Sequence, residues 1–275
     1  MTDLSDDIAA MVTRALAEDV GPGDITAALV ADETAEAQVI SRDHAIVCGS
    51  QWFEETYRQL DSTIKVHWLV KDGGQSAAND IVCQLTGPAR ALLTGERTAL
   101  NFLQTLSGTA TLAGRYADAV RGLGTAILDT RKTIPGLRRA QKYAVACGGC
   151  SNHRLGLFDA ILIKENHIAR AGGIQPAVAK ARKTNPGITV EVEVEDFEQL
   201  RSAIDARPDR ILLDNFQPED LRKAVLLTAG AVDLEASGGI NLENVRAIAE
   251  TGVAYISVGA LTKNVWAVDF SLRFD

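Results

Sequence analysis

The hydrophobic and polar positions of the chain follow two patterns, which change near residue 110. Before that point, the helical spacing of Ile8, Val12 and Leu16 predicts a helix over residues 6–18, with Ser5 as its cap. Short strand-like runs and two helical stretches follow, which predicts a small α+β domain. The strand-like runs are AQVISRD, AIVCGS, IKVHWLV and DIVCQLTG, and the helical stretches are QWFEETYRQL and ALLTGERTALNFLQTLSGTATLAGRYADAV.

From about residue 125 the order of the elements is regular. Strand-like runs alternate with helix-length segments at ~20–30 residues per unit, which is typical of parallel βα repeats. The strands are TAILDTR, DAILIKEN, ITVEVEVE, RILLDN, VDLEASGG and AYISVGAL; the helices are QPAVAKARKT, DFEQLRSAID, PEDLRKAVLL and NLENVRAIAE. An open doubly wound sheet is the alternative, but its first strand usually precedes a glycine-rich turn, which ILDTRKTIPG is not. The pattern favours an α/β barrel.

The run EVEVE alternates glutamate with valine, so Glu191, Glu193 and Glu195 share one face of the strand. An antiparallel strand with its glutamates in water would show the same alternation. In a parallel barrel the outer face packs under helices, so the valines face outward and at least one glutamate points into the barrel mouth. A carboxylate there is costly unless it meets a cation or a metal.

Polar residues follow the carboxyl end of every strand in the second half. Loops at this end build the active sites of βα barrels, so a succession of bases, acids and glycines predicts a catalytic barrel. The residues are Asp129, Thr130, Arg131, Lys132, Lys164, Glu165, Asn166, His167, Glu193, Asp214, Asn215, Ser237, Gly238, Gly239, Gly259 and Ala260.

The last two strand ends have the character of phosphate sites. Ser237-Gly238-Gly239 precedes a helix with Asn241 near its cap, and GAL follows the next strand. Backbone N–H groups at such turns bind phosphate, often after the last strands of a barrel. Two tight turns without a ligand are the alternative.

The charge of the chain is distributed unevenly. With 36 acidic against 28 basic residues, the surface as a whole argues against a nucleic-acid or anionic-membrane partner. Residues 131–154, however, contain six Lys or Arg, one His and no acid. Cations without counter-ions repel one another, so the ligand is expected to be anionic. The predicted mouth residues are Arg131, Lys132, His153, Arg154 and Lys164, whereas Arg138, Arg139 and Lys142 are expected to be mostly solvated.

Glu193 and Asp214 come from the opposite strands and suit a divalent metal or sugar hydroxyls. Together with the cations, they fit a substrate with carboxylate, phosphate and sugar parts.

The cysteines and the N-terminus carry less information. Cys147-Gly-Gly-Cys150 has the spacing of redox and zinc motifs, but the sequence offers no second pair, so two buried thiols beside a glycine turn is the preferred interpretation. The N-terminus MTDLSDDIAAMV is acidic, unlike a secretory signal, and no apolar run approaches the ~18 residues of a membrane span. A cytoplasmic enzyme is therefore expected.

Motifs over residues 18–262 resemble those of the quinolinate phosphoribosyltransferase family. They are EDVGPGDIT, GERTALNFLQTLSGTAT, DTRKTIPGLRRAQKYAV, NHRLGL, LIKENH, EVEVE, LLDNF and SGGI with VGALT. In one departure, Cys150 stands where the family usually has glycine, and cysteine tolerates a positive φ poorly.

The resemblance implies an α/β fold: an N-terminal α/β sandwich domain over residues 1–110, to which the tail 264–275 returns, and an incomplete α/β barrel over residues 111–263. It also implies a homodimer in which Arg97 reaches the neighbouring subunit's site. The implied reaction joins quinolinate to phosphoribosyl pyrophosphate and yields nicotinate mononucleotide, pyrophosphate and CO2 in de novo NAD biosynthesis.

The resemblance further implies the role of each site residue. Lys132, Lys164, Glu193 and Asp214 would be catalytic, and Glu193 and Asp214 would meet the ribose or Mg²⁺. Substrate would be bound by Arg97, Thr130, Arg131, Lys132, His153, Arg154, Lys164, Glu193 and Asp214. Phosphate would be bound by Ser237, Gly238, Gly239, Val258, Gly259 and Ala260.

Three other interpretations remain open. A molybdenum-transport-associated relative shares the fold, but its family lacks the LIKENH pattern. A Schiff-base aldolase would use Lys164 at a strand end, which borohydride trapping would reveal. A non-catalytic anion-binding barrel would bind both substrates without releasing CO2.

Overall fold

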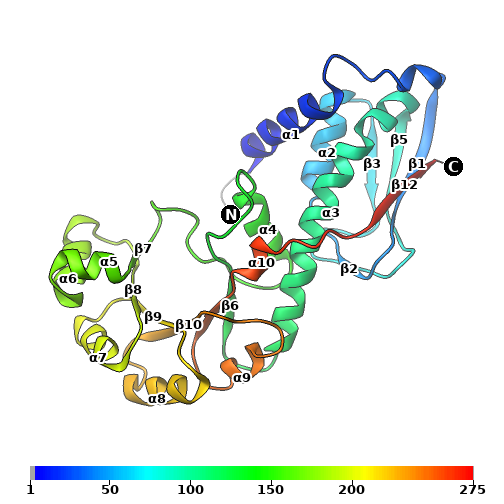
Figure 1. Cartoon of the computed structure of the whole chain (residues 1–275). Helices are drawn as coiled ribbons and strands as arrows, with labels where there is room; N and C mark the ends of the chain where they lie inside the picture. The colour runs from blue at the N-terminus through cyan, green and yellow to red at the C-terminus, as the bar shows by residue number, and fades with distance from the viewer. Residues whose placement is uncertain (1–3, 275) are drawn as a thin grey trace. The chain divides into compact units, whose positions relative to one another are not determined.

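A computed structural model describes residues 4–274 of the chain (Figure 1). The chain divides into two compact units. The first contains residues up to 113, 139–149 and from 265 onward; the second contains residues 114–138 and 150–264. The first unit thus includes a segment, 139–149, that lies beyond the boundary predicted at residue 110.

The first unit is built on a four-stranded antiparallel sheet in the order β12-β1-β5-β3. Its strands are β1 (Thr34–Ser41), β3 (Lys65–Trp68), β5 (Ile81–Pro88) and β12 (Phe270–Phe274). The last strand comes from the end of the chain and pairs with β1, with Val39 opposite Leu272. Two short strands, β2 (Ala45–Ile46) and β4 (Gln75–Ser76), form a separate antiparallel pair.

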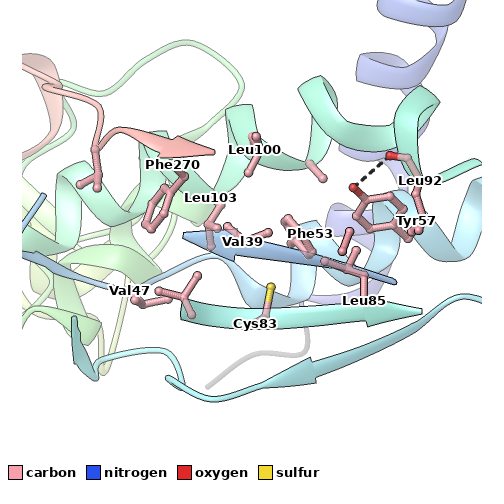
Figure 2. Packing of buried hydrophobic residues seen from close by; sticks show 14 of the residues in the cluster. Val39, Val47, Phe53, Tyr57, Cys83, Leu85, Leu92, Leu100, Leu103 and Phe270 are labelled. Carbon is pink, nitrogen blue, oxygen red and sulfur yellow. Dashed lines mark hydrogen bonds between the residues drawn. The ribbon is translucent and has the colours of Figure 1, made fainter. Parts of the chain in front are cut away.

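Helices supply the other half of the core in this unit. They are α1 (Ser5–Val20), the 3-10 turn η1 (Ala27–Leu29), α2 (Ser50–Leu60) and α3 (Ala89–Ala119), whose last residues belong to the second unit. Phe53 and Tyr57 of α2 and Leu100 and Leu103 of α3 pack with Leu85 of β5 in one buried cluster (Figure 2). Apolar burial of this kind is the main source of stability for such a sheet.

Helix α1 contains the predicted apolar stripe, and Ile8, Val12 and Leu16 are buried. The prediction of Ser5 as its cap is wrong, because Ser5 is already helical and Leu4 occupies the cap position without a side-chain hydrogen bond. Asp6 and Asp7 in the first turn favour this start, since negative charge is stabilising at a helix N-terminus.

The second unit contains a six-stranded parallel sheet in the order β6-β11-β10-β9-β8-β7. Its strands are β6 (Ala126–Leu128), β7 (Ile161–Ile163), β8 (Val190–Val194), β9 (Arg210–Asp214), β10 (Asp233–Ser237) and β11 (Tyr255–Ser257). The order ends at β6 and β7, so the sheet is not closed. The predicted incomplete α/β barrel is confirmed.

Helices alternate with these strands, as the sequence pattern predicts. They are α5 (Glu165–Ala171), α6 (Ile174–Thr184), α7 (Phe197–Ala206), α8 (Pro218–Thr228), α9 (Val245–Ala249) and α10 (Ala260–Lys263). Figure 1 shows α6 to α9 on the outer side of the curved row of strands. A doubly wound fold has helices on both faces of its sheet. Here the helices cover only the outer face of a curved sheet, so the doubly wound alternative is ruled out.

The β8 strand has the predicted two faces. Val190, Val192 and Val194 are fully buried, in agreement with packing under the outer helices. Glu191 and Glu193 lie on the other face, where both form ion pairs.

Helix α9 starts later than predicted. The prediction of a cap near Asn241 is wrong, because Asn244 occupies the cap position and the helix begins at Val245. The Asn241 side chain accepts hydrogen bonds from the amides of Glu243 and Asn244, at 2.9 and 3.2 Å. The Asn241 carbonyl also accepts the Val245 amide at 3.0 Å, so Asn241 closes the turn that leads into the helix.

Helix α4 (Arg138–Cys147) explains why residues 139–149 belong to the first unit. The Tyr143 ring lies 5.6 Å from the Trp52 ring, and the Tyr143 hydroxyl donates a hydrogen bond to Asp72 at 2.8 Å. Lys142 is only 3% exposed, so the expectation that this side chain is mostly solvated is wrong. Lys142 is buried on α4 and takes part in an interaction there.

No helix among residues 4–274 combines the length and the apolar character that a membrane crossing requires.

The chain end and α3 approach so closely at Gly108 that no larger residue fits. A Cβ atom on Gly108 would overlap the carbonyl oxygen of Trp266 and lie 2.9 Å from its carbonyl carbon. We therefore expect Gly108→Ala to lower the free energy of unfolding by about 1–3 kcal/mol, as overpacking usually does. Urea denaturation of the full chain measures this change.

The matched control is Gly124→Ala, because a Cβ atom there has nothing within 4 Å. Equal urea midpoints for the two variants would show that the approach of Trp266 to α3 is not a constraint.

Candidate active site

Lysine and glutamate meet at the carboxyl ends of two neighbouring strands. Lys164 follows β7 directly, and its Nζ lies 2.5 Å from Oε2 of Glu193 on β8. Lys164 is 43% exposed, whereas Glu193 is 12% exposed, so the ammonium group can reach solvent while the carboxylate stays inside. The predicted inward glutamate has the cation that its burial requires.

The next two strands, β9 and β10, also end in polar residues. Asp214 and Ser237 are the last residues of β9 and β10 and lie opposite each other in the parallel register. A Cβ atom on Gly238 would overlap the Asn215 side-chain oxygen, so only glycine allows this approach. Asn215 in turn donates a hydrogen bond to the Asp214 carboxylate at 2.9 Å. Asp214 is therefore oriented at the same edge of the sheet as Glu193.

Contacts between β11 and β6 bring the last turn to the cationic loop. Thr262 donates a hydrogen bond to the Lys132 carbonyl at 2.7 Å. A Cβ atom on Gly259 would lie 3.1 Å from Cδ of Lys132, so the lysine side chain passes over this glycine. Thr130 accepts a hydrogen bond from the Lys132 amide at 3.1 Å. Thr130, Lys132 and Gly259 are therefore neighbours.

Asp129 organises the segment that carries His153. Its carboxylate is fully buried and accepts hydrogen bonds from the His153 amide at 2.9 Å and the Asn152 side chain at 2.7 Å. The Ser151 amide donates to the Ile127 carbonyl at 2.8 Å, which aligns this segment with β6. The loop of residues 151–154 is thereby fixed beside the strand end that carries Arg131.

Arg131 and Arg154 place two guanidinium groups close together. The Nε of Arg131 is buried and has no hydrogen-bond partner among the described residues. Burial lowers the pKa of Arg154, and the charge of Arg131 lowers it further. Two cations that repel each other, one with an unsatisfied buried donor, are arranged for an anionic ligand.

Below this surface lies a buried charge network. His153 Nε2 is 2.9 Å from Oε2 of Glu191 and 3.5 Å from Oε1 of Glu235. Arg210 Nη1 is 2.8 Å from Oε2 of Glu235, and the guanidinium stacks on the Tyr255 ring with its Cζ 3.7 Å from the centroid. Both carboxylates are almost completely buried, so each needs the cationic or donor group that it contacts.

Protons in this network are held more tightly than usual. Burial raises the pKa of Glu235 to about 7, and the nearby Glu191 carboxylate adds to the effect. Burial by itself would lower the pKa of His153, but the Glu191 hydrogen bond and the charges of Glu235 and Glu191 outweigh it and raise that pKa. His153 Nδ1 accepts the Arg154 amide at 2.7 Å, so the neutral ring carries its proton on Nε2.

The sequence analysis did not single out Glu191, Glu235 and Arg210 for a role of their own. The available signal was a charged residue inside an otherwise apolar strand, in RILLD and DLEAS, together with Glu191 in the EVEVE run. In the structure Glu191 lies opposite Arg210 in the register of β8 and β9.

The remaining residues predicted to bind phosphate differ in whether their backbone groups are already hydrogen-bonded. The Val258 amide donates to the Leu128 carbonyl at 2.8 Å, so this N–H is used in the sheet and does not face a phosphate. Ala260 starts the short helix α10. Gly239 has a φ of 62° and accepts a hydrogen bond from the Asn244 side chain at 3.0 Å.

Arg97 belongs to the first unit, where it is exposed on α3 and lines a surface hollow with Asp19, Asp24 and Thr94. Its predicted role in a neighbouring subunit stays a prediction.

Two family models together match most of the chain, from residue 24 to residue 273. The quinolinate phosphoribosyl transferase N-terminal domain matches residues 24–107, and the C-terminal domain of the same family matches residues 109–273.

Known proteins are similar over nearly the whole length. A probable carboxylating nicotinate-nucleotide pyrophosphorylase of Bacillus subtilis is 42% identical over 93% of this chain and 89% of its own length. A solved nicotinate-nucleotide pyrophosphorylase of Francisella tularensis is 49% identical, with a TM-score of 0.97 over 98% of this chain and 97% of its own. The NadC structure of Streptococcus pyogenes is 36% identical, with a TM-score of 0.95 over 100% of both chains.

Both family models, a relative of more than 40% identity and the arrangement of polar residues at the strand ends lead to one conclusion. This chain belongs to the quinolinate phosphoribosyl transferase family.

Proposed function

We propose that this chain transfers the phosphoribosyl group of phosphoribosyl pyrophosphate to quinolinate and releases pyrophosphate and CO2. The product is nicotinate mononucleotide, an intermediate of de novo NAD biosynthesis. The observation that carries the proposal is the unsatisfied buried Nε of Arg131 beside Arg154, at the same sheet edge as the Lys164–Glu193 pair.

The two arginines suit a dicarboxylate. Each guanidinium can form paired hydrogen bonds with a carboxylate, and a charge-assisted bond contributes roughly 1.5–3 kcal/mol. Arg154 is already anchored by a hydrogen bond from Nη1 to the Ala160 carbonyl at 3.2 Å, so little ordering is needed when substrate binds. Arg131 and Arg154 would hold the pyridine ring in one orientation, with its nitrogen toward the sugar.

Glu193 and Asp214 suit the sugar. As the pyridine nitrogen attacks the anomeric carbon, the bond from that carbon to pyrophosphate breaks, and positive charge develops on the ribose ring. A carboxylate placed there beforehand stabilises this charge in the transition state. Lys164 can move from Glu193 to an anionic substrate, because its ammonium group is partly exposed. Glu193 is then free for the ribose.

Decarboxylation needs no further group from the protein. After ribosylation the ring nitrogen is cationic and accepts the electron pair of the bond to the adjacent carboxylate. CO2 leaves, and a proton takes its place on the ring carbon. The contribution of the protein is alignment and charge placement.

The acidic pair also fits Mg²⁺. Mg²⁺ is usually held by one or two carboxylates and by substrate phosphates, and Glu193 and Asp214 supply carboxylate oxygens of this kind. In the described part of the chain neither residue belongs to a group of three metal-ligating side chains, so the substrate would supply most of the ligands. When bound, the ion would neutralise the departing pyrophosphate.

The functional molecule is proposed to be a homodimer with Arg97 reaching the partner's site. Arg97 is exposed on α3, as a residue that contacts another subunit must be.

The buried network has a positioning role in this scheme. Glu191 holds the His153 ring, and the backbone of His153 and Arg154 is held by Asp129 and by the His153 ring itself. The network thereby fixes the loop from which the Arg154 guanidinium projects.

The reaction itself is the first test. Protein mixed with Mg²⁺, phosphoribosyl pyrophosphate and quinolinate is expected to form nicotinate mononucleotide and CO2 in equal amounts, as chromatography and trapped labelled CO2 would show. EDTA is expected to stop both, and excess Mg²⁺ to restore them, because the leaving group needs a counter-charge. Binding of both substrates without CO2 would contradict the enzymatic function, and full activity in EDTA would remove the metal.

Loss of either cation should be severe. For Arg131→Ala and Lys164→Ala we expect kcat/KM to fall by about 100-fold or more, since each variant loses charge-assisted bonds to the substrate. The controls are Arg170→Ala and Lys180→Ala, whose side chains are exposed on α5 and α6. Near-native activity of Arg131→Ala or Lys164→Ala, with the fold intact by circular dichroism, would refute the site assignment.

The raised pKa of Glu235 makes part of the stability depend on pH. The folded protein holds this proton more tightly than the unfolded chain, where glutamate titrates near 4.3. The stabilisation is therefore complete below about pH 4 and is lost as the pH rises through about 7.

Glu235→Gln abolishes this titration. The unfolding free energy of the parent minus that of the variant should fall by about 2 kcal/mol between pH 5 and pH 8, as urea denaturation can measure. Glu243→Gln changes an exposed carboxylate and serves as the control. A difference that is the same at both pH values would mean that Glu235 does not hold its proton in the folded state.

A further inference from the structure

Two thiols and a carboxylate converge in the first unit, and none of the three belongs to the strand ends that form the candidate active site. Cys48 precedes α2, Asp72 lies in the turn between β3 and β4, and Cys147 is the last residue of α4. One ligand atom from each side chain lies within 4.8 Å of the other two.

We propose that Cys48, Asp72 and Cys147 form a binding site for a thiophilic divalent cation of the zinc class. The proposal does not rest on the phosphoribosyl transfer proposed above.

The donor set selects a soft metal. Cysteine sulfur binds Zn²⁺ at about 2.3 Å and carboxylate oxygen at about 2.0–2.2 Å, which puts tetrahedral ligand atoms roughly 3.5–3.8 Å apart. Ligand atoms already within 4.8 Å of one another need only small rotations to reach this spacing. Three protein ligands leave the fourth position for water. Mg²⁺ prefers an all-oxygen octahedral shell and is a poor match for two sulfurs.

Asp72 is held in place before any metal binds. Its Oδ2 accepts hydrogen bonds from the Tyr143 hydroxyl at 2.8 Å and the Gly49 amide at 3.2 Å, and its Oδ1 accepts from the Ser50 amide at 3.1 Å. Each carboxylate oxygen has two lone pairs, so Oδ1 keeps one for a metal. Hydrogen bonds of this kind to a ligating group raise metal affinity because they fix its orientation.

The backbone around Cys48 is equally fixed. Ser107 accepts a hydrogen bond from the Cys48 amide at 2.9 Å and donates one to the Cys48 carbonyl at 3.1 Å. Val47 exchanges two 2.9 Å backbone hydrogen bonds with Gly73 and Gly74, which join this segment to the turn that carries Asp72. The site is therefore preorganised, and binding orders little additional chain.

Access to the site is possible from one side. Cys48 is fully buried, whereas Asp72 and Cys147 are partly exposed, so an ion can enter past these two side chains. Cys150 is not in the group, and it belongs to the other unit. Of the two cysteines in the C-x-x-C motif, only Cys147 belongs to the site, and Cys48 provides the second thiol.

Cobalt titration of the full-length protein, kept reduced, tests the site. Co²⁺ bound to thiolates gives an intense near-ultraviolet charge-transfer band, which oxygen ligands alone do not produce, so binding at the active-site carboxylates is not confused with it. We expect the band to appear with one equivalent of Co²⁺. Zn²⁺ should abolish it by displacement, and excess Mg²⁺ should leave it unchanged.

Variants assign the ligands. Cys147→Ser and Cys48→Ser are expected to lose the band, and Asp72→Asn, which keeps acceptors for the Tyr143 hydroxyl and the α2 amides, should weaken Co²⁺ binding by about 10-fold or more. Cys150→Ser is the matched control and should retain the band. If Cys48→Ser does not fold, the partly exposed Cys147 and Asp72 positions still decide the outcome.

The proposal is overturned if the parent protein shows no thiolate band, or if Cys147→Ser keeps it. It is also overturned if the reduced protein binds no Co²⁺ and mass spectrometry of air-oxidised protein finds Cys48 and Cys147 joined in a disulfide. That result would show that Cys48 and Cys147 form a redox-active pair and not a metal site.

Discussion

The inner side of the parallel sheet depends on one constraint, which is that buried charges must be matched. Glu191 and Glu235 are almost inaccessible to water, and a bare carboxylate in such a place would be strongly unfavourable. His153 and Arg210 supply the matching groups, and Arg210 is further covered by the Tyr255 ring. Adjacent parallel strands align their carboxyl ends, so the paired charges of the interior lie beneath one common rim. The charged residues at this rim remain available to bind a ligand.

The interior of the sheet pairs opposite charges, whereas its rim brings two like charges together. Below, each carboxylate has a donor within hydrogen-bonding or ion-pair distance. Above, Arg131 keeps an unsatisfied Nε, and Arg154 lies close enough to Arg131 for its pKa to fall. A buried guanidinium nitrogen without a hydrogen-bond partner, next to a second cation, lacks a negative group that an anionic ligand can supply.

Local pattern was enough to predict the strands of the parallel sheet, most helices and the inward glutamates of the EVEVE run, but not the strands β4 and β12. Period-two alternation reports directly which residues share a face, so the pairing of Glu193 with a cation could be expected. Arg210 and Glu235 were missed because their importance comes from strand order, which places them beside Glu191 and His153. The burial of Lys142 and the meeting of Cys147 with Cys48 were missed for the same reason, since both depend on contacts distant in sequence. The predicted helix cap near Asn241 was wrong for a different reason. The Asn241 side chain closes a turn that precedes the first residue of α9.

The pairing of β12 with β1 has a consequence for how the protein is made. The strand that completes the first sheet, Phe270–Phe274, is translated after all six strands of the parallel sheet. During synthesis, β1 must therefore wait with one edge unpaired while the whole parallel sheet is translated, and an open edge can pair with another nascent chain. The first sheet is thus completed only after the strands of the second unit have been translated, and translation products that end before β12 would keep this edge of β1 unpaired.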